Sequence, residues 1–272
     1  MKYNYLSLLL HPVTALQYLL RRIPPRYFFQ TRIELDAVRR PQYAYGLSRA
    51  AWQAKALGIN NITAIEFGVA AGHGLLLIEK YAQLITNLTG VDIDVIGFDL
   101  EEGLPEPADF RDMPYIWKKG FFKMDREALE RKLSPSTSLF LGDVSETVPE
   151  FQKCGFSPIG FVAFDMDFYS STIESFRLFE DSHDKFLPRV YCYFDDIIGP
   201  DEELMNSYVG ELLAIQEFNA AHKNMKFSLI NGLKYKRIFQ AAWNDMIYVL
   251  HRFDHPLYNE YIYPENKRQT LL

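Results

Sequence analysis

The stretch Glu66-Phe67-Gly68-Val69-Ala70-Ala71-Gly72-His73-Gly74 decides the fold, because it joins two segments of different periodicity. Residues 63–67 before it predict a strand, and residues 75–87 after it predict a helix. Glycines in such a turn let the backbone bend tightly and approach a ligand closely. The turn therefore indicates an α/β fold with a ligand site at the end of its first strand.

The spacing of acid and glycines in this turn, E-x-G-x-x-x-G-x-G, favours one kind of ligand. The dinucleotide-binding pattern G-x-G-x-x-G is not met, because Ala70 and His73 stand at its second and third glycine positions. Glu66 places a negative charge two residues before the first glycine, which suits a cationic amino acid group better than a pyrophosphate. A structural turn without a ligand is the alternative.

Beyond the turn, segments typical of strands and of helices alternate. Further strands are expected at residues 94–98, 139–141, 161–164, 190–194, 226–230 and 246–252. Helices are expected at residues 42–57 and 203–223. This alternation predicts a mostly parallel sheet with helices on both faces, closed by the last two strands as an antiparallel pair.

Composition excludes several classes of protein. The chain has 272 residues, 48% of them hydrophobic, which suffices for one large domain or two small ones. Its formal net charge of -6 gives no broad basic face, so nucleic acid is not an expected partner. The two cysteines, Cys154 and Cys192, cannot form a disulfide framework and are expected to fill the core. A reducing, cytoplasmic location fits this cysteine content.

Carboxylates follow four of the expected strands. Asp99 ends the second strand and Asp143 follows the third, where an acid can bind a ribose hydroxyl or an adenine amino group. Asp165 and Asp167 follow the fourth strand, and the pair Asp195-Asp196 follows the fifth. Because neighbouring parallel strands end at one edge of a sheet, these side chains are expected to converge.

Converging carboxylates repel one another, so some must be protonated or a cation must lie among them. Oxygen ligands without nearby histidines favour Mg2+, Ca2+ or Mn2+ over zinc. The six histidines are scattered along the chain, and none is assigned a catalytic role. A set of separate, solvated loop acids is the alternative.

Taken in order, these residues resemble those of the macrocin O-methyltransferase-like branch of the class I methyltransferases, which methylates sugar hydroxyls on natural products. The resemblance runs from about residue 66 to residue 196, and its ordered set of motifs is specific although each motif alone is weak. The motifs are Glu66-x-Gly68 with its glycine turn, Gly97-Phe98-Asp99, Glu102-Gly103-Leu104-Pro105, Trp117-x-x-Gly120-Phe121, Gly142-Asp143, Asp165-x-Asp167-x-Tyr169-x-Ser171-Thr172 and Asp195-Asp196.

The resemblance implies a Rossmann-like fold with a seven-stranded sheet, S-adenosylmethionine as methyl donor, and a divalent cation, usually Mg2+. Asp165, Asp195 and Asp196 would hold the cation, in a way similar to catechol O-methyltransferase, and Asp167 would be the general base. The acceptor would be a hydroxyl of a small molecule, such as a sugar on a natural product or glycan. The residues expected around the donor are Glu66, Gly68, Ala70, Gly72, Gly74, Asp99, Asp143 and Asp165.

Departures from the family pattern lie on the acceptor side. The Pro-Gly-Gly turn usual before the fifth strand is Pro188-Arg189-Val190 here, and Ile197 replaces the tyrosine that usually follows the paired aspartates. An arginine usual in the next helix is not evident near Glu211. A binding or scaffold protein with this fold and no catalysis is therefore the main alternative.

Two other enzyme classes fit the sequence poorly. A short-chain dehydrogenase would need its Tyr-x-x-x-Lys pair in a long helix, but Tyr115 and Lys119 lie too soon after the glycine turn. An amino methyltransferase of nucleic acids would need a Pro-Pro motif after the fourth strand, whereas Pro24-Pro25 lies far upstream.

The N-terminal segment is apolar but does not predict a membrane span. Residues 4–20 carry no formal charge, are short for a span, and lack a signal-peptide cleavage site. We expect a helix that packs on the body or on a second copy of the chain, with shallow membrane attachment as the alternative. The expected division is an N-terminal helical arm or cap (residues 1–60), a methyltransferase domain (61–255) and a C-terminal tail (256–272).

Overall fold

A seven-stranded sheet lies between two layers of helices in the computed structural model, which describes residues 12–24 and 27–263. The strands are β1 (Asn61–Phe67), β2 (Asp92–Asp99), β3 (Thr137–Leu141), β4 (Ile159–Phe164), β5 (Phe186–Phe194), β6 (Met225–Leu229) and β7 (Ile247–Arg252). The helices are α2 (Pro12–Arg22), α3 (Phe29–Glu34), α4 (Pro41–Ala56), α5 (His73–Thr89), α6 (Arg126–Glu130), α7 (Val144–Gln152), α8 (Tyr169–Ser175), α9 (Gly210–Ala221) and α10 (Leu233–Lys236). The predicted α/β fold is confirmed.

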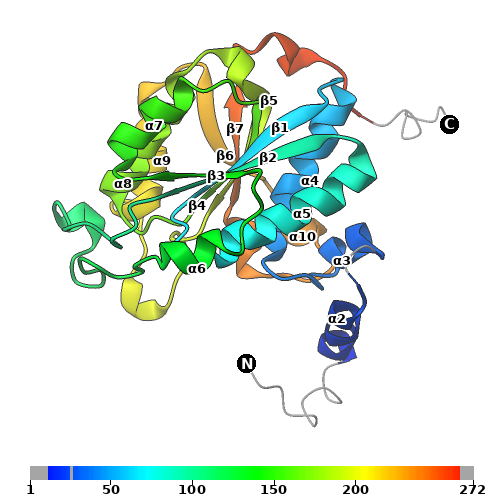
Figure 1. Ribbon diagram of the computed structural model, residues 1–272, viewed down its shortest axis with the longest axis horizontal. Coiled ribbons are helices and arrows are strands. Elements are labelled where there is room, and N and C mark those ends of the chain that lie inside the picture. The colour runs from blue at the N-terminus through cyan, green and yellow to red at the C-terminus, as the bar shows by residue number, and fades with distance from the viewer. Residues whose placement is uncertain (1–11, 25–26, 264–272) are drawn as a thin grey trace.

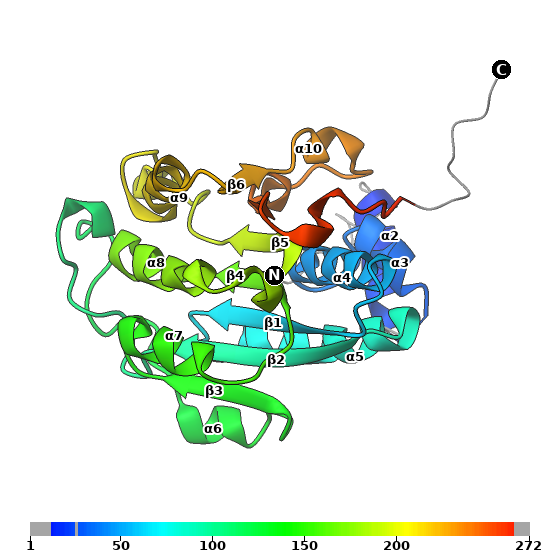
Figure 2. The ribbon, with the colours of Figure 1, turned by 90° about the horizontal axis from the view of Figure 1, so that it is seen from above.

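Helices cover both faces of the sheet, as Figures 1 and 2 show. Helices α4 and α5 pack on one face, and α7, α8 and α9 lie on the other. A central strand then has no solvated side, and β4 is buried at every position. This explains why the strand is apolar throughout instead of alternating between apolar and polar residues.

The order of the strands, β3-β2-β1-β4-β5-β7-β6, reverses between β1 and β4. The chain runs outward from β1 through β2 to β3 and then returns to place β4 on the other side of β1. These strands and β5 are all parallel, so their carboxyl ends lie at one edge of the sheet. Ligands of such sheets bind at this edge, where the order of strands reverses.

The last two strands close the sheet as predicted. β7 pairs antiparallel with β5 on one side and with β6 on the other. Only β7 runs against the rest of the sheet, because β6 and β5 both pair antiparallel with it. The closing pair therefore lies at one end of the strand order, away from the reversal between β1 and β4.

A row of stacked phenylalanine rings crosses five neighbouring strands just before the strands end. Successive ring centroids lie 5.2, 4.6, 5.5 and 4.7 Å apart in the order Phe140, Phe98, Phe67, Phe164 and Phe194. Rigid aromatic packing fixes the positions of the residues that directly follow Phe98, Phe164 and Phe194, which are predicted carboxylates. Of the two free cysteines, Cys192 is buried as expected, whereas Cys154 is only half-buried and does not fill the core.

One predicted helix begins later than the sequence pattern indicates. The prediction spans residues 203–223, but α9 begins at Gly210 and ends at Ala221. Asp201–Glu203 form a short 3-10 turn, after which Leu204 adopts a left-handed φ of 50°. The prediction was wrong for residues 203–209, because apolar spacing does not reveal a left-handed residue that ends the turn.

The N-terminal arm is described from residue 12 onward, so residues 4–11 of the apolar segment lie outside the described part. Gln17 of α2 donates to the backbone oxygen of Leu35 at 2.9 Å, which ties the helix to the body. Leu16 and Leu19 on the same helix are 46% and 60% exposed. No helix of the described residues is long and apolar enough to cross a bilayer. Contact with a second copy and the domain boundaries remain predictions.

A buried arginine ties the C-terminal part of the fold to the N-terminal part. Arg237, with 2% of its side chain exposed, pairs with Asp36 at 2.8 Å and with Glu34 at 2.9 Å. Its guanidinium also lies against the rings of Tyr45 and Trp243. Removing one partner of a buried ion pair leaves the other charge uncompensated. We expect Arg237→Met to lower the free energy of unfolding by about 3 kcal/mol, measured by denaturant titration.

The matched control for this prediction is Arg131→Met. Arg131 pairs with Glu127 at 3.8 Å, and their side chains are 70% and 88% exposed. An exposed pair of this kind contributes little, so the control should change stability by less than about 1 kcal/mol. Equal losses in the two variants would contradict the role given to Arg237.

Candidate functional site

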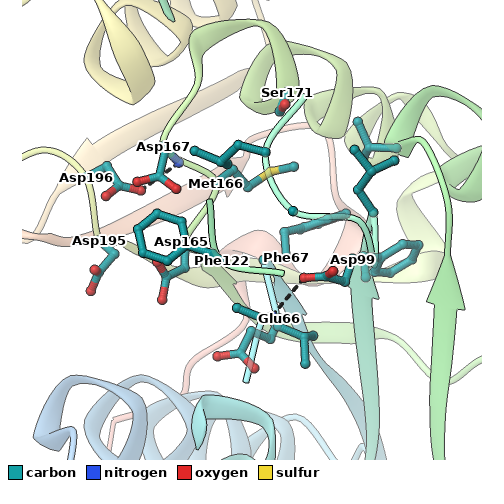
Figure 3. Close-up of a pocket in the computed structure, with 18 of the residues that line it drawn as sticks. Glu66, Phe67, Asp99, Phe122, Asp165, Met166, Asp167, Ser171, Asp195 and Asp196 are labelled. Atoms are coloured by element: carbon teal, nitrogen blue, oxygen red, sulfur yellow. Dashed lines mark hydrogen bonds between the residues drawn. The ribbon is translucent and has the colours of Figure 1, made fainter. Parts of the chain in front are cut away.

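A cavity of about 970 Å³ opens at the carboxyl ends of the strands, beside the reversal between β1 and β4. It is lined by the glycine turn, by the carboxylates that follow β2, β3, β4 and β5, and by loop residues that include Trp117 and Phe122. Figure 3 shows Asp165, Asp167, Asp195 and Asp196 grouped on one side of this space and Asp99 on the other. All the predicted site residues line this cavity except Gly72.

The glycine turn is shaped by close approaches that only glycine permits. A Cβ atom on Gly68, whose φ is 83°, would lie 1.7 Å from the backbone oxygen of Asp165. A Cβ atom on Gly74 would lie 1.8 Å from a carboxylate oxygen of Glu66. Gly72 instead faces the side chain of Leu129, because a Cβ atom on Gly72 would lie 2.2 Å from Cδ1 of Leu129. The first and last glycines therefore make room at the cavity, and Gly72 serves the packing of the turn.

Glu66 is buried at the end of β1, with 1% of its surface exposed. Its Oε1 accepts a hydrogen bond from the hydroxyl of Tyr43 at 2.7 Å, while its buried Oε2 has no partner among the described residues. Burial raises the pKa of this carboxyl to about 8. An unsatisfied buried oxygen costs free energy that a cationic ligand group could recover. The residue fits the cationic amino acid group expected from the sequence.

The raised pKa of Glu66 predicts how its burial affects stability. The unfolded chain releases this proton near the ordinary pKa of 4.5, whereas the folded protein holds it until about pH 8. Between these values the folded state binds more protons, so this residue makes stability fall as pH rises. Glu66→Gln removes this contribution, so the free energy of unfolding of the variant should have a slope against pH that is less negative than that of the wild type by about 1.4 kcal/mol per pH unit. Denaturant titrations between about pH 5 and pH 8 measure the two slopes, and identical slopes would refute the prediction.

The acids at the ends of β2 and β3, Asp99 and Asp143, line the cavity and accept hydrogen bonds from nearby backbone N–H groups. Asp99 accepts hydrogen bonds from the backbone N–H of Ala70 at 2.8 Å and of Glu101 at 2.7 Å. It therefore links the glycine turn to the loop after β2. Asp143 accepts from the backbone N–H of Ser145 at 2.8 Å and caps the first turn of α7. Both lie where the sequence placed them, at the ends of their strands.

Three carboxylates converge after β4 and β5. One oxygen from each of Asp165, Asp195 and Asp196 lies within 4.8 Å of the others. Burial and the neighbouring Asp195 raise the pKa of Asp165 to about 7. Burial also raises the pKa of Asp196 well above its ordinary value, and the charge of Asp167 adds to the shift. Such mutual repulsion is what a bound divalent cation would relieve, and oxygen donors suit Mg2+ or Ca2+.

Asp167 lies beside this trio in an unusual backbone conformation. Its φ is 61°, a left-handed value that Asp and Asn adopt more readily than most residues. Its backbone N–H donates to Oδ2 of Asp196 at 2.8 Å. Burial, followed by the charges of Asp165 and Asp195, raises the pKa of its carboxyl to about 7. A carboxyl of this pKa can accept a proton near neutral pH.

Three residues of the site were not identified from the sequence. Arg40 pairs with Asp165 at 3.3 Å, and Tyr43 hydrogen-bonds Glu66. Glu211, fully buried at the start of α9, accepts from the backbone N–H of Asp196 at 3.1 Å. Helical periodicity predicted a buried face for the helix that carries Tyr43. No local pattern shows that this face would meet the glycine turn.

Comparison with known proteins adds to this geometry. No protein-family model matches the chain, and no curated protein matches it. The crystal structure of CalS11, a calicheamicin methyltransferase, is similar, with 19% sequence identity and a TM-score of 0.50 over 93% of this chain and 95% of that chain. The O-methyltransferase NovP is similar, with 14% identity and a TM-score of 0.51 over 78% of this chain and 80% of that chain.

Likeness at this level of identity shows the fold. The protein has the Rossmann-like fold of the class I methyltransferases, with a seven-stranded sheet and an antiparallel C-terminal pair of strands. The fold prediction is confirmed. Membership in the macrocin branch and the roles of individual residues remain predictions.

Proposed function

We propose that the protein is an S-adenosylmethionine-dependent O-methyltransferase that uses a divalent cation, usually Mg2+, to methylate a hydroxyl of a small molecule. One observation carries the proposal: an unpartnered buried carboxylate oxygen, on Glu66, shares a cavity with three carboxylates clustered within 4.8 Å. The first suits the cationic end of the methyl donor, and the second suits a divalent cation. Their shared cavity lies where ligands of this fold class bind.

The donor side of the cavity fits S-adenosylmethionine at three places. Glu66 would accept a hydrogen bond from its ammonium group, and the small residues Gly68, Ala70 and Gly74 would let it lie against the turn. Asp99 would bind the ribose and Asp143 the adenine amino group, because both carboxylates line the cavity. When bound, the donor supplies an electrophilic methyl group on a positively charged sulfur.

The cation side fits a divalent ion. Asp165, Asp195 and Asp196 would hold it, and its charge would lower the pKa of an acceptor hydroxyl and fix the oxygen in place. Asp167 would accept the hydroxyl proton as the new oxygen–carbon bond forms and the sulfur–carbon bond breaks. The products are a methyl ether and S-adenosylhomocysteine. Holding both reactants in one cavity contributes to the rate by removing the entropy cost of their encounter.

A sugar hydroxyl of a natural product or glycan is the proposed acceptor. The ordered motifs of the sequence resemble a family that methylates such hydroxyls, and CalS11, a protein of the same fold, is described as a calicheamicin methyltransferase. On the acceptor side, Ile197 stands where the resembled family usually has a tyrosine. Its side chain is apolar and buried, so it cannot supply the polar contact of a tyrosine hydroxyl. The protein is therefore expected to bind its acceptor by different contacts.

The test is an assay with purified protein, S-adenosylmethionine and a panel of nucleotide sugars, glycosides and catechols. We expect formation of S-adenosylhomocysteine with at least one sugar, dependent on Mg2+ and abolished by a chelator. Activity confined to catechols would overturn the proposed acceptor class. Tight binding of S-adenosylhomocysteine without turnover on any acceptor would instead favour a non-catalytic binding or scaffold protein.

A further inference from the structure

Arg40 reaches the cavity from the start of α4. It precedes the first turn of this helix with a left-handed φ of 39°. Its Nη1 donates to the hydroxyl of Tyr43 at 2.8 Å and lies 3.3 Å from Oδ2 of Asp165. Its side chain is 35% exposed, and it lines the cavity. The guanidinium is therefore held from two sides and is still accessible to a ligand.

Tyr43 places this cation next to the buried carboxylate of Glu66. The Tyr43 hydroxyl accepts from Nη1 of Arg40 and donates to Oε1 of Glu66 at 2.7 Å. One oxygen atom therefore separates the guanidinium of Arg40 from the carboxyl group of Glu66. Both contacts of Arg40 use Nη1, and its other two guanidinium nitrogens make no hydrogen bond to the described residues.

Few other cations face this cavity. Its lining includes no lysine, and the second arginine, Arg177, pairs with Glu174 at 3.2 Å. His73 is the remaining basic residue of the lining, on the first turn of α5. An anionic ligand group that lies near Glu66 would therefore meet Arg40 as the nearby fixed cation.

We infer that Arg40 binds the carboxylate of the donor's amino acid end, while Glu66 binds its ammonium group. This inference rests on the proposed function. The two ligand groups are bonded to one carbon atom, so they need opposite charges a short distance apart. The bridge through Tyr43 holds the guanidinium of Arg40 close to the carboxyl group of Glu66, whose ionised form a bound ammonium group would favour. Planar guanidinium groups recognise carboxylates well.

The competing explanation is that Arg40 only neutralises Asp165. Truncated ligands separate the two roles, because a residue that acts on Asp165 alone does not distinguish ligands with and without a carboxylate. The ligands are S-adenosylhomocysteine, its decarboxylated analogue, which lacks only the carboxylate, and methylthioadenosine, which lacks the whole amino acid end. Calorimetry of each ligand with the full chain in a chelator gives three affinities.

The wild-type protein should bind S-adenosylhomocysteine about tenfold or more tightly than the decarboxylated analogue, since a charged hydrogen-bonded pair is lost. Arg40→Gln should reduce this ratio to about one and change the affinity for the decarboxylated analogue by less than about threefold. Arg40→Lys should keep part of the ratio, because it retains the charge. Arg49→Gln is the matched control on the same helix, since Arg49 pairs with Glu34 and does not line the cavity.

The outcomes are distinct. A wild-type ratio near one, or an unchanged ratio in a folded Arg40→Gln protein, would overturn the inference about Arg40. Failure of the wild-type protein to bind S-adenosylhomocysteine at all would overturn the proposed function instead. The wild-type ratio is measured on unaltered protein, and Arg40→Lys tests the role of Arg40 if Arg40→Gln does not fold.

Discussion

Asp167→Asn should abolish methyl transfer and leave donor binding nearly intact. The amide has the shape of the carboxyl group but cannot accept a proton, so the turnover rate is expected to fall by a factor of about 10² to 10⁴. Asn also tolerates the left-handed φ of 61° at this position, so the hydrogen bond from residue 167 to Asp196 is retained. The substitution therefore removes the proton acceptor without disturbing the backbone that carries it.

Initial rates of S-adenosylhomocysteine formation measure the loss, and calorimetry with S-adenosylhomocysteine measures donor affinity. The donor dissociation constant should change by less than about threefold. Asp109→Asn is the matched control, because Asp109 is exposed, pairs with Arg111 at 2.8 Å and does not line the cavity. Loss of donor binding in a folded Asp167→Asn protein would argue against the role of Asp167 as a base, as would retained turnover.

The strand ends could be predicted from the sequence because the pattern that marks them lies in neighbouring residues. Buried parallel strands are apolar throughout, so the first polar residue after each run marks the point where the strand leaves the core. This holds for Asp99, Asp165 and Asp195, each of which directly follows a buried phenylalanine of the stacked row. The topology of a parallel sheet then brings these residues to one edge without any further information.

The contacts between α4 and the strand ends could not be predicted, because they join segments far apart in the chain. Arg40 and Asp165 are 125 residues apart, and Tyr43 and Glu66 are 23 apart. Helical periodicity shows that Tyr43 is buried but not which strand it meets. The same limit applies to Glu211, whose carboxylate accepts a hydrogen bond from the backbone N–H of Asp196, a residue in the loop before α9.

Removing the divalent cation should abolish turnover and lower thermal stability together. In the folded protein the clustered carboxylates repel one another, and burial raises the pKa of Asp165 to about 7. An ion that binds only the folded state stabilises it by about 2.7 kcal/mol at a concentration of one hundred times its dissociation constant. For a chain of this size, such a gain corresponds to a rise in melting temperature of about 5 °C or more.

The test compares wild-type protein with Asp195→Asn and Asp196→Ala, with and without Mg2+. Mg2+ should raise the melting temperature of the wild type but of neither of these two variants, and turnover should fall by about a hundredfold or more in both variants and in chelator. Asp195→Asn is the sharper variant, because Asp196 also accepts the backbone N–H of Asp167. Glu106→Gln, an exposed carboxylate of the same cavity, is the control and should keep the Mg2+ response.

The two readouts, turnover and melting temperature, together test whether the cation binds at the three carboxylates. If Asp195→Asn lost turnover but kept the full thermal response to Mg2+, the ion would bind elsewhere and the trio would be a set of mutually repelling acids. If chelator left wild-type turnover unchanged, Arg40 would be the nearest positive group to these carboxylates, because it lies 3.3 Å from Asp165. The same chelator experiment therefore decides whether the protein's own guanidinium or a bound ion balances these carboxylates during the reaction.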